Sequence, residues 1–289
     1  MTNSIEIRGL CKSYGDFALR DVNLTLPGGT IMGLIGENGA GKTTTIKCIL
    51  NLIRRDEGTI TLLGHDNQRE ERAAKLEVGV VLDECFFHDS LRPRDLKRIL
   101  GPVYPAWDNG LYEDYLKKFR LPEDKYIKEF SRGMKMKLSL AAALAHHPKL
   151  LILDEATAGL DPVVRDEILD EFLGFICDED HAILISSHIT SDLEKAADYI
   201  TYLHQGRVAL SQPKDELLDR YGRVGCSAAD LAAIQPGDLL RVRRGTFGCE
   251  GLTADREAFR RKYPGLTVDP ATLEDIMLFI GKGESLCAD

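Results

Sequence analysis

Hydrophobic and polar residues alternate in the first part of the chain. Ile5-Glu6-Ile7 and the run Val22 to Leu26 follow a period of two, which is typical of strands with one buried face. Turn signals close these runs at Tyr14-Gly15-Asp16 and at Pro27-Gly28-Gly29. The pattern predicts antiparallel strands that lead into the apolar run Ile31 to Ile35.

Mostly apolar runs recur at residues 78–82, 149–155 and 182–187. Strands that are buried on both faces have this composition, and they belong to parallel sheets covered by helices. Residues 91–147, between the first two runs, space their apolar positions as helices do. We therefore expect an α/β fold with an antiparallel β subdomain and a helical subdomain, at about residues 86–147, inserted between core strands.

The character of the chain changes near residue 221. Ile200 to Leu203 and Val208 to Leu210 predict a hairpin just before that point. Two Pro-Gly turns, a basic alternation at residues 239–244 and an amphipathic helix at about residues 272–280 follow. We predict a main domain over residues 1–221 and a small C-terminal accessory region over residues 222–289.

The composition excludes several classes of protein. Hydrophobic residues make up 44% and charged residues 29% of the 289 residues, as in globular proteins. No apolar stretch approaches the ~20 residues that span a bilayer, and Met1 to Leu10 does not resemble a secretion signal. The net charge of −9 disfavours nucleic acid as a partner, because that binding rests on clustered Lys and Arg. Any membrane role would come from a partner chain.

The seven cysteines include no Cys-x-x-Cys pair, and their number is odd. This usage favours reduced thiols in a cytosolic protein over disulfides or a zinc site. They stand at Cys11, Cys48, Cys85, Cys177, Cys226, Cys249 and Cys287.

The segment Gly36 to Thr44 fits the pattern G-x-x-x-x-G-K-[ST] between a predicted strand and a predicted helix. Its glycines let backbone N–H groups turn toward phosphate oxygens, and the helix that follows points its positive end at the same anion. Lys42 would reach the β- and γ-phosphates, and the hydroxyl of Thr43 would ligate Mg²⁺. The sequence therefore predicts a nucleoside triphosphate site. Its binding residues are Gly36, Asn38, Gly39, Ala40, Gly41, Lys42, Thr43 and Thr44.

Two adjacent carboxylates, Asp154 and Glu155, follow the four apolar residues 150–153. A buried strand would bring both to its carboxyl end, where ligands of open α/β sheets bind. We expect Asp154 to hold Mg²⁺ through water and Glu155 to polarise the attacking water.

At this point the chain resembles the nucleotide-binding subunit of an ABC transporter, a P-loop NTPase, over about three quarters of its length. The family's signature, commonly Leu-Ser-Gly-Gly-Gln, stands here as residues 130–134, Phe-Ser-Arg-Gly-Met. Ser131 and Gly133 match it, whereas Arg132 and Met134 depart from it. The resemblance implies a head-to-tail dimer in which the helix after Ser131 meets the γ-phosphate held by the other subunit.

The resemblance assigns roles to three further residues. Tyr14 matches the aromatic residue that stacks on adenine, and His188, after Ser186-Ser187, matches the histidine that contacts the γ-phosphate. Asp161, in Ala158-Gly159-Leu160-Asp161, matches the loop that communicates with the opposite site. The resemblance thus makes Lys42, Glu155 and His188 the catalytic group.

Asp83 stands where the family usually carries a glutamine that senses Mg²⁺ and the attacking water. A carboxylate there would reach the metal through water, and either Asp83 or Glu84 could fill the role, Asp83 being preferred. The metal set is then Thr43, Asp83 and Asp154. The aromatic pair Phe86-Phe87 would either fold under the helical subdomain or form a groove for a membrane subunit, which the family docks near Asp83 to Phe87.

The last helix, after Pro270, is similar to the closing helix of drug and peptide-antibiotic exporter subunits. We therefore expect an ATP- and Mg²⁺-dependent motor on the cytoplasmic face of the membrane, paired with itself or with a related cassette, that drives a separately encoded permease. Two alternatives stay open: a soluble ABC ATPase in cofactor assembly or another non-transport role, and a regulatory module that binds ATP without hydrolysis. The sequence does not name the cargo.

Overall fold

The computed structural model describes residues 3–245 and 248–284. The chain forms two compact units, Met1–Val208 and Ala209–Asp289. The second unit begins before the predicted boundary at residue 221, because helix α8 (Lys214–Arg220) contacts helix α10 (Arg256–Lys262) and strand β14 (Thr267–Pro270).

A six-stranded sheet forms the centre of the first unit, and one of its edge strands continues past Val208 into the second unit. Its strands lie side by side in the order β10 (Arg207–Pro213), β9 (Tyr199–His204), β3 (Ile31–Ile35), β8 (Ala182–Ser187), β7 (Leu150–Asp154) and β6 (Val78–Val81). The pairs from β9 to β6 are parallel. Every residue of β3, β7 and β8 is buried, which confirms the expectation from their apolar runs.

A second sheet of the first unit is antiparallel, as the alternating pattern predicts. It runs in the order β2 (Phe17–Pro27), β1 (Asn3–Tyr14), β4 (Glu57–Leu62) and β5 (His65–Asp66). The inward positions of these strands join the core of the parallel sheet. That shared core includes Ile5, Ile7, Leu24, Leu34 and Ile152.

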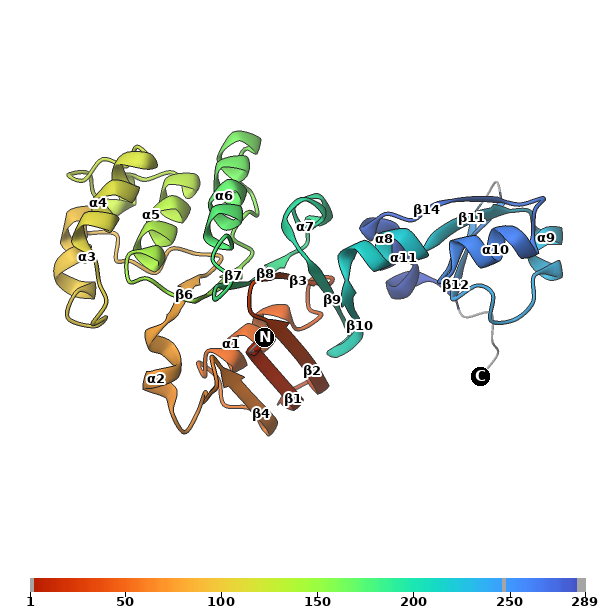
Figure 1. The fold of residues 1–289 in the computed structure, drawn as a ribbon, viewed down its shortest axis with the longest axis horizontal. Helices are drawn as coiled ribbons and strands as arrows, with labels where there is room; N and C mark the ends of the chain where they lie inside the picture. The colour runs from red at the N-terminus through yellow and green to blue at the C-terminus, as the bar shows by residue number, and fades with distance from the viewer. Residues whose placement is uncertain (1–2, 246–247, 285–289) are drawn as a thin grey trace. The chain divides into compact units, whose positions relative to one another are not determined.

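Helices connect the strands and cover the sheets (Figure 1). The helical subdomain is confirmed: α3, α4 and α5 follow one another between β6 and β7, and Figure 1 shows them grouped together. The helices of this unit are α1 (Lys42–Ile49), α2 (Glu71–Leu76), α3 (Pro93–Leu100), α4 (Asn109–Lys118), α5 (Arg132–Leu144), α6 (Pro162–Phe175) and α7 (Thr190–Ala196), with a 3₁₀ turn at Ile127–Glu129.

The second unit has its own sheet and core. Its elements follow in the order β11 (Gly222–Cys226), α9 (Ala228–Ala233), β12 (Arg241–Gly245), β13 (Gly248–Thr253), α10, β14 and α11 (Leu273–Lys282). The strands are antiparallel in the order β12-β13-β11-β14. This is the split β-α-β arrangement found in ferredoxin-like domains. Val224, Val242 and Val268 meet Leu231 and Phe259 in its core.

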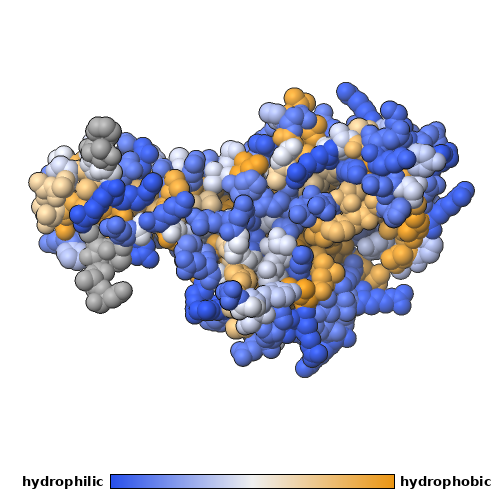
Figure 2. All heavy atoms as spheres, turned by 180° about the vertical axis from the view of Figure 1, so that it is seen from behind, coloured by the Kyte–Doolittle hydropathy of each residue, from blue (hydrophilic) through white to orange (hydrophobic). Residues whose placement is uncertain are grey.

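Apolar side chains are mostly buried, and no helix among residues 3–245 and 248–284 is long and apolar enough to cross a membrane. Figure 2 shows hydrophilic side chains over most of the face it presents, with apolar patches on the first unit. The six cysteines in the described part of the chain are free thiols. Cys287 lies outside the described residues.

Candidate functional site

A cavity of about 410 Å³ opens where the segment after β3 meets the carboxyl ends of β7 and β8. It gathers residues that are far apart in the sequence, and most of them are site residues that the motifs predict. They are Phe17, Glu37, Asn38, Gly39, Gly41, Lys42, Thr43, Thr44, Asp83, Arg132, Glu155, Ala158 and His188.

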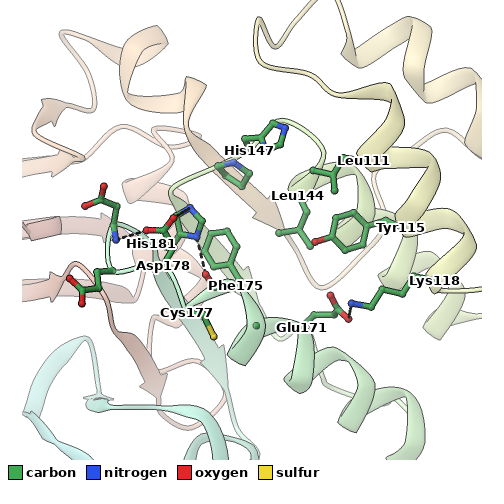
Figure 3. Close-up of a pocket in the computed structure, with 14 residues that line it drawn as sticks. Leu111, Tyr115, Lys118, Leu144, His147, Glu171, Phe175, Cys177, Asp178 and His181 are labelled. Atoms are coloured by element: carbon green, nitrogen blue, oxygen red, sulfur yellow. Dashed lines mark hydrogen bonds and ion pairs between the residues drawn. The ribbon is translucent and has the colours of Figure 1, made fainter.

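A larger cavity, of about 980 Å³, lies between α4, the end of α5 and the loop after α6 (Figure 3). The ring of His181 stacks there on Phe175 with centroids 4.2 Å apart, and Lys118 pairs with Glu171 at 2.5 Å. These contacts tie the loop and the helices together. None of the predicted site residues lines this cavity, so we take the smaller cavity as the candidate site.

The loop between β3 and α1 is shaped by its glycines. Gly39 and Gly41 have φ values of 84° and 110°, a region that favours glycine. A side chain at Gly36 would meet the backbone oxygen of Leu203 at 2.4 Å. Gly41 caps α1 without a side-chain hydrogen bond, so the helix start offers its N–H groups to an anion. Ala40, which belongs to this loop, is buried and does not line the cavity.

The three residues that we expect to be catalytic meet at one side of the cavity. Glu155 Oε1 lies 3.4 Å from Lys42 Nζ, and Glu155 Oε2 lies 2.6 Å from His188 Nδ1. Lys42 Nζ also donates to the carbonyl oxygen of Gly36 at 2.8 Å. Two basic groups therefore hold one carboxylate, and the ammonium group of Lys42 is already at the phosphate loop.

Glu155 has a left-handed backbone, with φ of 52°, immediately after β7. This is uncommon for a residue other than glycine and costs free energy. The turn carries the Glu155 side chain out of the buried strand and into the cavity. Asp154, one residue earlier, is only 1% exposed and stays at the strand end.

The predicted metal ligands are hard oxygen donors, which Mg²⁺ prefers. Thr43 and Asp83 line the same cavity, Asp154 stands at the end of the adjacent strand, and Glu84 does not line the cavity. Within residues 3–245 and 248–284, no three His, Cys, Asp or Glu side chains are placed to hold a metal ion. Mg²⁺ in nucleotide sites is held by one or two carboxylates together with phosphate oxygens, so these residues fit a metal that arrives with its nucleotide.

The signature residues Ser131 and Gly133 lie at the start of α5, outside the cavity lining. Ser131 is the N-cap of α5, and its Oγ accepts a hydrogen bond from the Met134 N–H at 3.2 Å. Asp161 plays the same part for α6 by accepting from the Val164 N–H. Arg132, by contrast, does line the cavity.

Tyr14 and Phe17 pair across the turn between β1 and β2. Phe17 lines the cavity, whereas Tyr14 is 48% exposed. Lys12 Nζ lies over the Tyr14 ring, 5.4 Å from the ring centroid. Sequence reasoning missed Phe17. The two-residue turn Gly15-Asp16 was the signal for it, because such a turn places the residue after it opposite Tyr14.

The family model described as ABC transporter matches residues 19–158. The ABC transporter ATP-binding protein YtrB of Bacillus subtilis is 33% identical over 76% of this chain and 75% of its own length. The lantibiotic transport ATP-binding protein SrtF of Streptococcus pyogenes is 34% identical over 73% of this chain and 91% of its own length.

A third relative, the Nod factor export ATP-binding protein I of Rhizobium sp. strain N33, is 30% identical over 95% of this chain and 96% of its own length. Among solved structures, an ATP-binding subunit of an ABC transporter matches with a TM-score of 0.68 and 28% identity, over 74% of this chain and 91% of that one. The chain therefore belongs to the ABC transporter family, as an ATPase subunit of the exporter type.

Proposed function

We propose that this ATPase activates the attacking water with Glu155 and stabilises the γ-phosphate with Lys42 and His188. The observation that carries the proposal is the meeting of these three side chains at the cavity beside the phosphate loop. Lys42 and His188 both contact the Glu155 carboxylate. The γ-phosphate would draw these two basic groups to itself and leave the carboxylate free to accept a proton from water.

Thr43, Asp83 and Asp154 would hold Mg²⁺ at this site. A metal bound there would supply positive charge against the negative charge that develops on the phosphates. Asp83 adds a carboxylate to this rim of the cavity, and Arg132 lines the same cavity with a guanidinium group. The cation of Arg132 offsets part of the negative charge that Asp83 brings near the triphosphate.

We further propose that two cassettes, two copies of this chain or this chain with a related one, close around two nucleotides. Ser131, Gly133 and Asp161 stand at the starts of α5 and α6 and do not line the cavity of their own chain. A second cassette, placed head to tail, would receive them at its own nucleotide. Closure and reopening then convert hydrolysis into motion.

The proposed membrane partner docks on an apolar groove of about 360 Å³ between α5 and the segment after β6. Phe86 is 72% exposed beside it and Phe87 is half-buried, so the structure favours the groove over the alternative in which both rings are core. His146 lies in the groove, where burial lowers its pKa and keeps it uncharged at neutral pH. An apolar helix end from a permease on the cytoplasmic side would fit this surface.

The relatives point to the direction of transport and to a class of cargo. Their names speak of lantibiotic, bacitracin and Nod factor transport or export and of daunorubicin resistance. We propose that this subunit likewise powers outward movement of an amphipathic compound. The membrane subunits would select that compound, and the cassette would supply the force.

The substitution Glu155→Gln tests the catalytic proposal. It keeps the size of the side chain and removes the base, so hydrolysis should fall about 10²–10⁴-fold while ATP binding persists. Steady-state phosphate release and binding of a fluorescent ATP analogue measure the two effects. Glu84→Gln is the matched control, because Glu84 lies next to Asp83 but outside the nucleotide cavity. Unchanged turnover in Glu155→Gln would refute the role of Glu155.

A further inference from the structure

The first five residues of β8 are Ala-Ile-Leu-Ile-Ser, and Ser186 is the polar residue among them. It is fully buried, and the parallel register between β7 and β8 places it opposite Asp154. No motif assigns it a role. A buried hydroxyl is costly unless its hydrogen bonds are satisfied, so its partners show what it does.

The Ser186 hydroxyl contacts both residues of the acidic pair. Its Oγ donates to Asp154 Oδ1 at 2.5 Å and accepts from the Glu155 N–H at 3.1 Å. The Glu155 N–H also points at the Ser186 carbonyl oxygen, at 3.2 Å. One residue of β8 therefore holds the carboxylate of Asp154 and the backbone of Glu155 at once.

Each contact acts on a feature that needs support. The Asp154 carboxylate is buried, and a donor on Oδ1 fixes its rotation and leaves Oδ2 for a metal-bound water. The Glu155 backbone is left-handed, and such a conformation persists only where the surroundings hold it. Ser186 supplies two acceptors to the N–H group at that turn.

We propose that Ser186 is a positioning residue for ATP hydrolysis, which orients Asp154 toward Mg²⁺ and Glu155 toward the attacking water. This inference rests on the proposed roles of Asp154 and Glu155. It adds a link between β7 and β8, because His188, two residues after Ser186, contacts the Glu155 carboxylate from the same strand end.

Ser187 provides a matched control. It is also fully buried and comes next in the chain, but its Oγ accepts from the Ile189 N–H at 3.0 Å. Ser187→Ala therefore removes an equivalent hydroxyl from the same strand end without removing a contact to Asp154 or Glu155.

The experiment compares the full chain with Ser186→Ala, Ser187→Ala, Ser186→Thr and Glu155→Gln. It measures kcat and KM for ATP, thermal melts, and the affinity for a fluorescent ATP analogue in Mg²⁺ and in EDTA. Loss of a residue that orients a metal ligand typically costs about 10–100-fold in metal affinity or activity. In Ser186→Ala, kcat should fall about 10–100-fold, and so should the factor by which Mg²⁺ raises the affinity for the ATP analogue. KM for ATP and the affinity for the analogue in EDTA should stay within about threefold of the parent chain.

Ser187→Ala should stay within about twofold in every quantity, and Ser186→Thr, which keeps the hydroxyl, should recover most of the loss. If Ser186→Ala does not fold, Ser186→Cys takes its place, since a thiol is close in size and only a weak donor. The inference is overturned if the Ser186 variant keeps both its kcat and the increase in nucleotide affinity that Mg²⁺ gives the parent chain. It is also overturned if Ser187→Ala loses as much in kcat and in that increase as the Ser186 variant does. Full turnover in Glu155→Gln would instead overturn the catalytic roles on which the inference rests.

Discussion

At the scale of single residues, two aromatic rings compete for the role of adenine contact. Tyr14 is half exposed at the β1–β2 turn. Phe17 packs against the phosphate loop so closely that a side chain at Gly41 would meet its ring at 2.8 Å. A base needs an exposed aromatic face for stacking, whereas the phosphate loop needs a packed neighbour. We therefore assign stacking to Tyr14 and support of the loop to Phe17.

Tyr14→Ala should weaken ATP binding and leave the binding of inorganic tripolyphosphate unchanged. Stacking of one base on an aromatic ring is worth about 1–3 kcal/mol, or roughly 5- to 150-fold in Kd. Titration calorimetry with both ligands measures the difference. Tyr14→Phe should bind ATP within about threefold of the parent chain, because it keeps the ring.

Phe17→Ala should weaken both ligands together, because it loosens the loop itself. If Phe17→Ala weakened the binding of ATP but not of tripolyphosphate, and Tyr14→Ala bound ATP like the parent chain, Phe17 would be the stacking ring.

At the scale of elements, the starts of helices α5 and α6 combine structural and chemical duties. The Ser131 oxygen accepts from the Met134 N–H, which leaves its hydroxyl proton to donate elsewhere. In the proposed dimer that proton would meet a γ-phosphate oxygen of the other nucleotide. The N-cap and the phosphate contact can therefore be separated by substitution.

Ser131→Ala should lose about 1 kcal/mol in free energy of unfolding, whereas Ser131→Asp, also a good N-cap, should unfold like the parent chain. Both should lose hydrolysis, because alanine has no donor and aspartate places a negative charge against phosphate. Urea unfolding and steady-state turnover give the two quantities. Parental turnover in Ser131→Asp would rule out the phosphate contact.

Sequence reasoning predicted the elements whose pattern is local. The apolar runs of β7 and β8 and the strand before Gly36 are confirmed, because a strand buried on both faces leaves few alternatives. The apolar run also predicted Asp154 and Glu155 at the carboxyl end of β7, whereas their grouping with Lys42 came from the family resemblance. Ser186 was not found, since only the register of β7 against β8 brings its hydroxyl to Asp154.

At the scale of the whole molecule, the second unit was the part least accessible to sequence reasoning. Its strands are short, and the sequence around β12 (Arg241–Gly245), with its exposed arginines, showed only a basic alternation that did not predict a strand order. The strand order in its sheet depends on pairing between β11 and β14, which no local signal specifies. Leu217 of α8 is fully buried in a helix that contacts α10 and β14, so the division from the first unit lies earlier than composition suggests.

The proposed assembly with a membrane subunit depends on Phe86. Phe86→Ala should leave turnover of the isolated chain within about twofold and reduce binding of the permease at least about tenfold, as for an anchor residue of an interface. Co-purification from detergent-solubilised membranes with Mg²⁺ and ATP, followed by mass identification, measures this binding. Recovery with soluble partners instead would favour the role in cofactor assembly.

Val103→Ala is the control for that experiment, because Val103 is a comparably exposed apolar residue that does not line the groove. It should bind the permease like the parent chain. A thermal melt lowered by several degrees in Phe86→Ala would place that ring in the core.

The left-handed backbone at Glu155 has an evolutionary consequence. A glycine would adopt this conformation freely, so thermodynamic stability alone would select glycine there. The residue present instead carries a strain of about 1–3 kcal/mol, which the rest of the fold must tolerate. Selection for function has thus opposed selection for stability at this position, and lineages that abandon hydrolysis are expected to drift there toward glycine or asparagine.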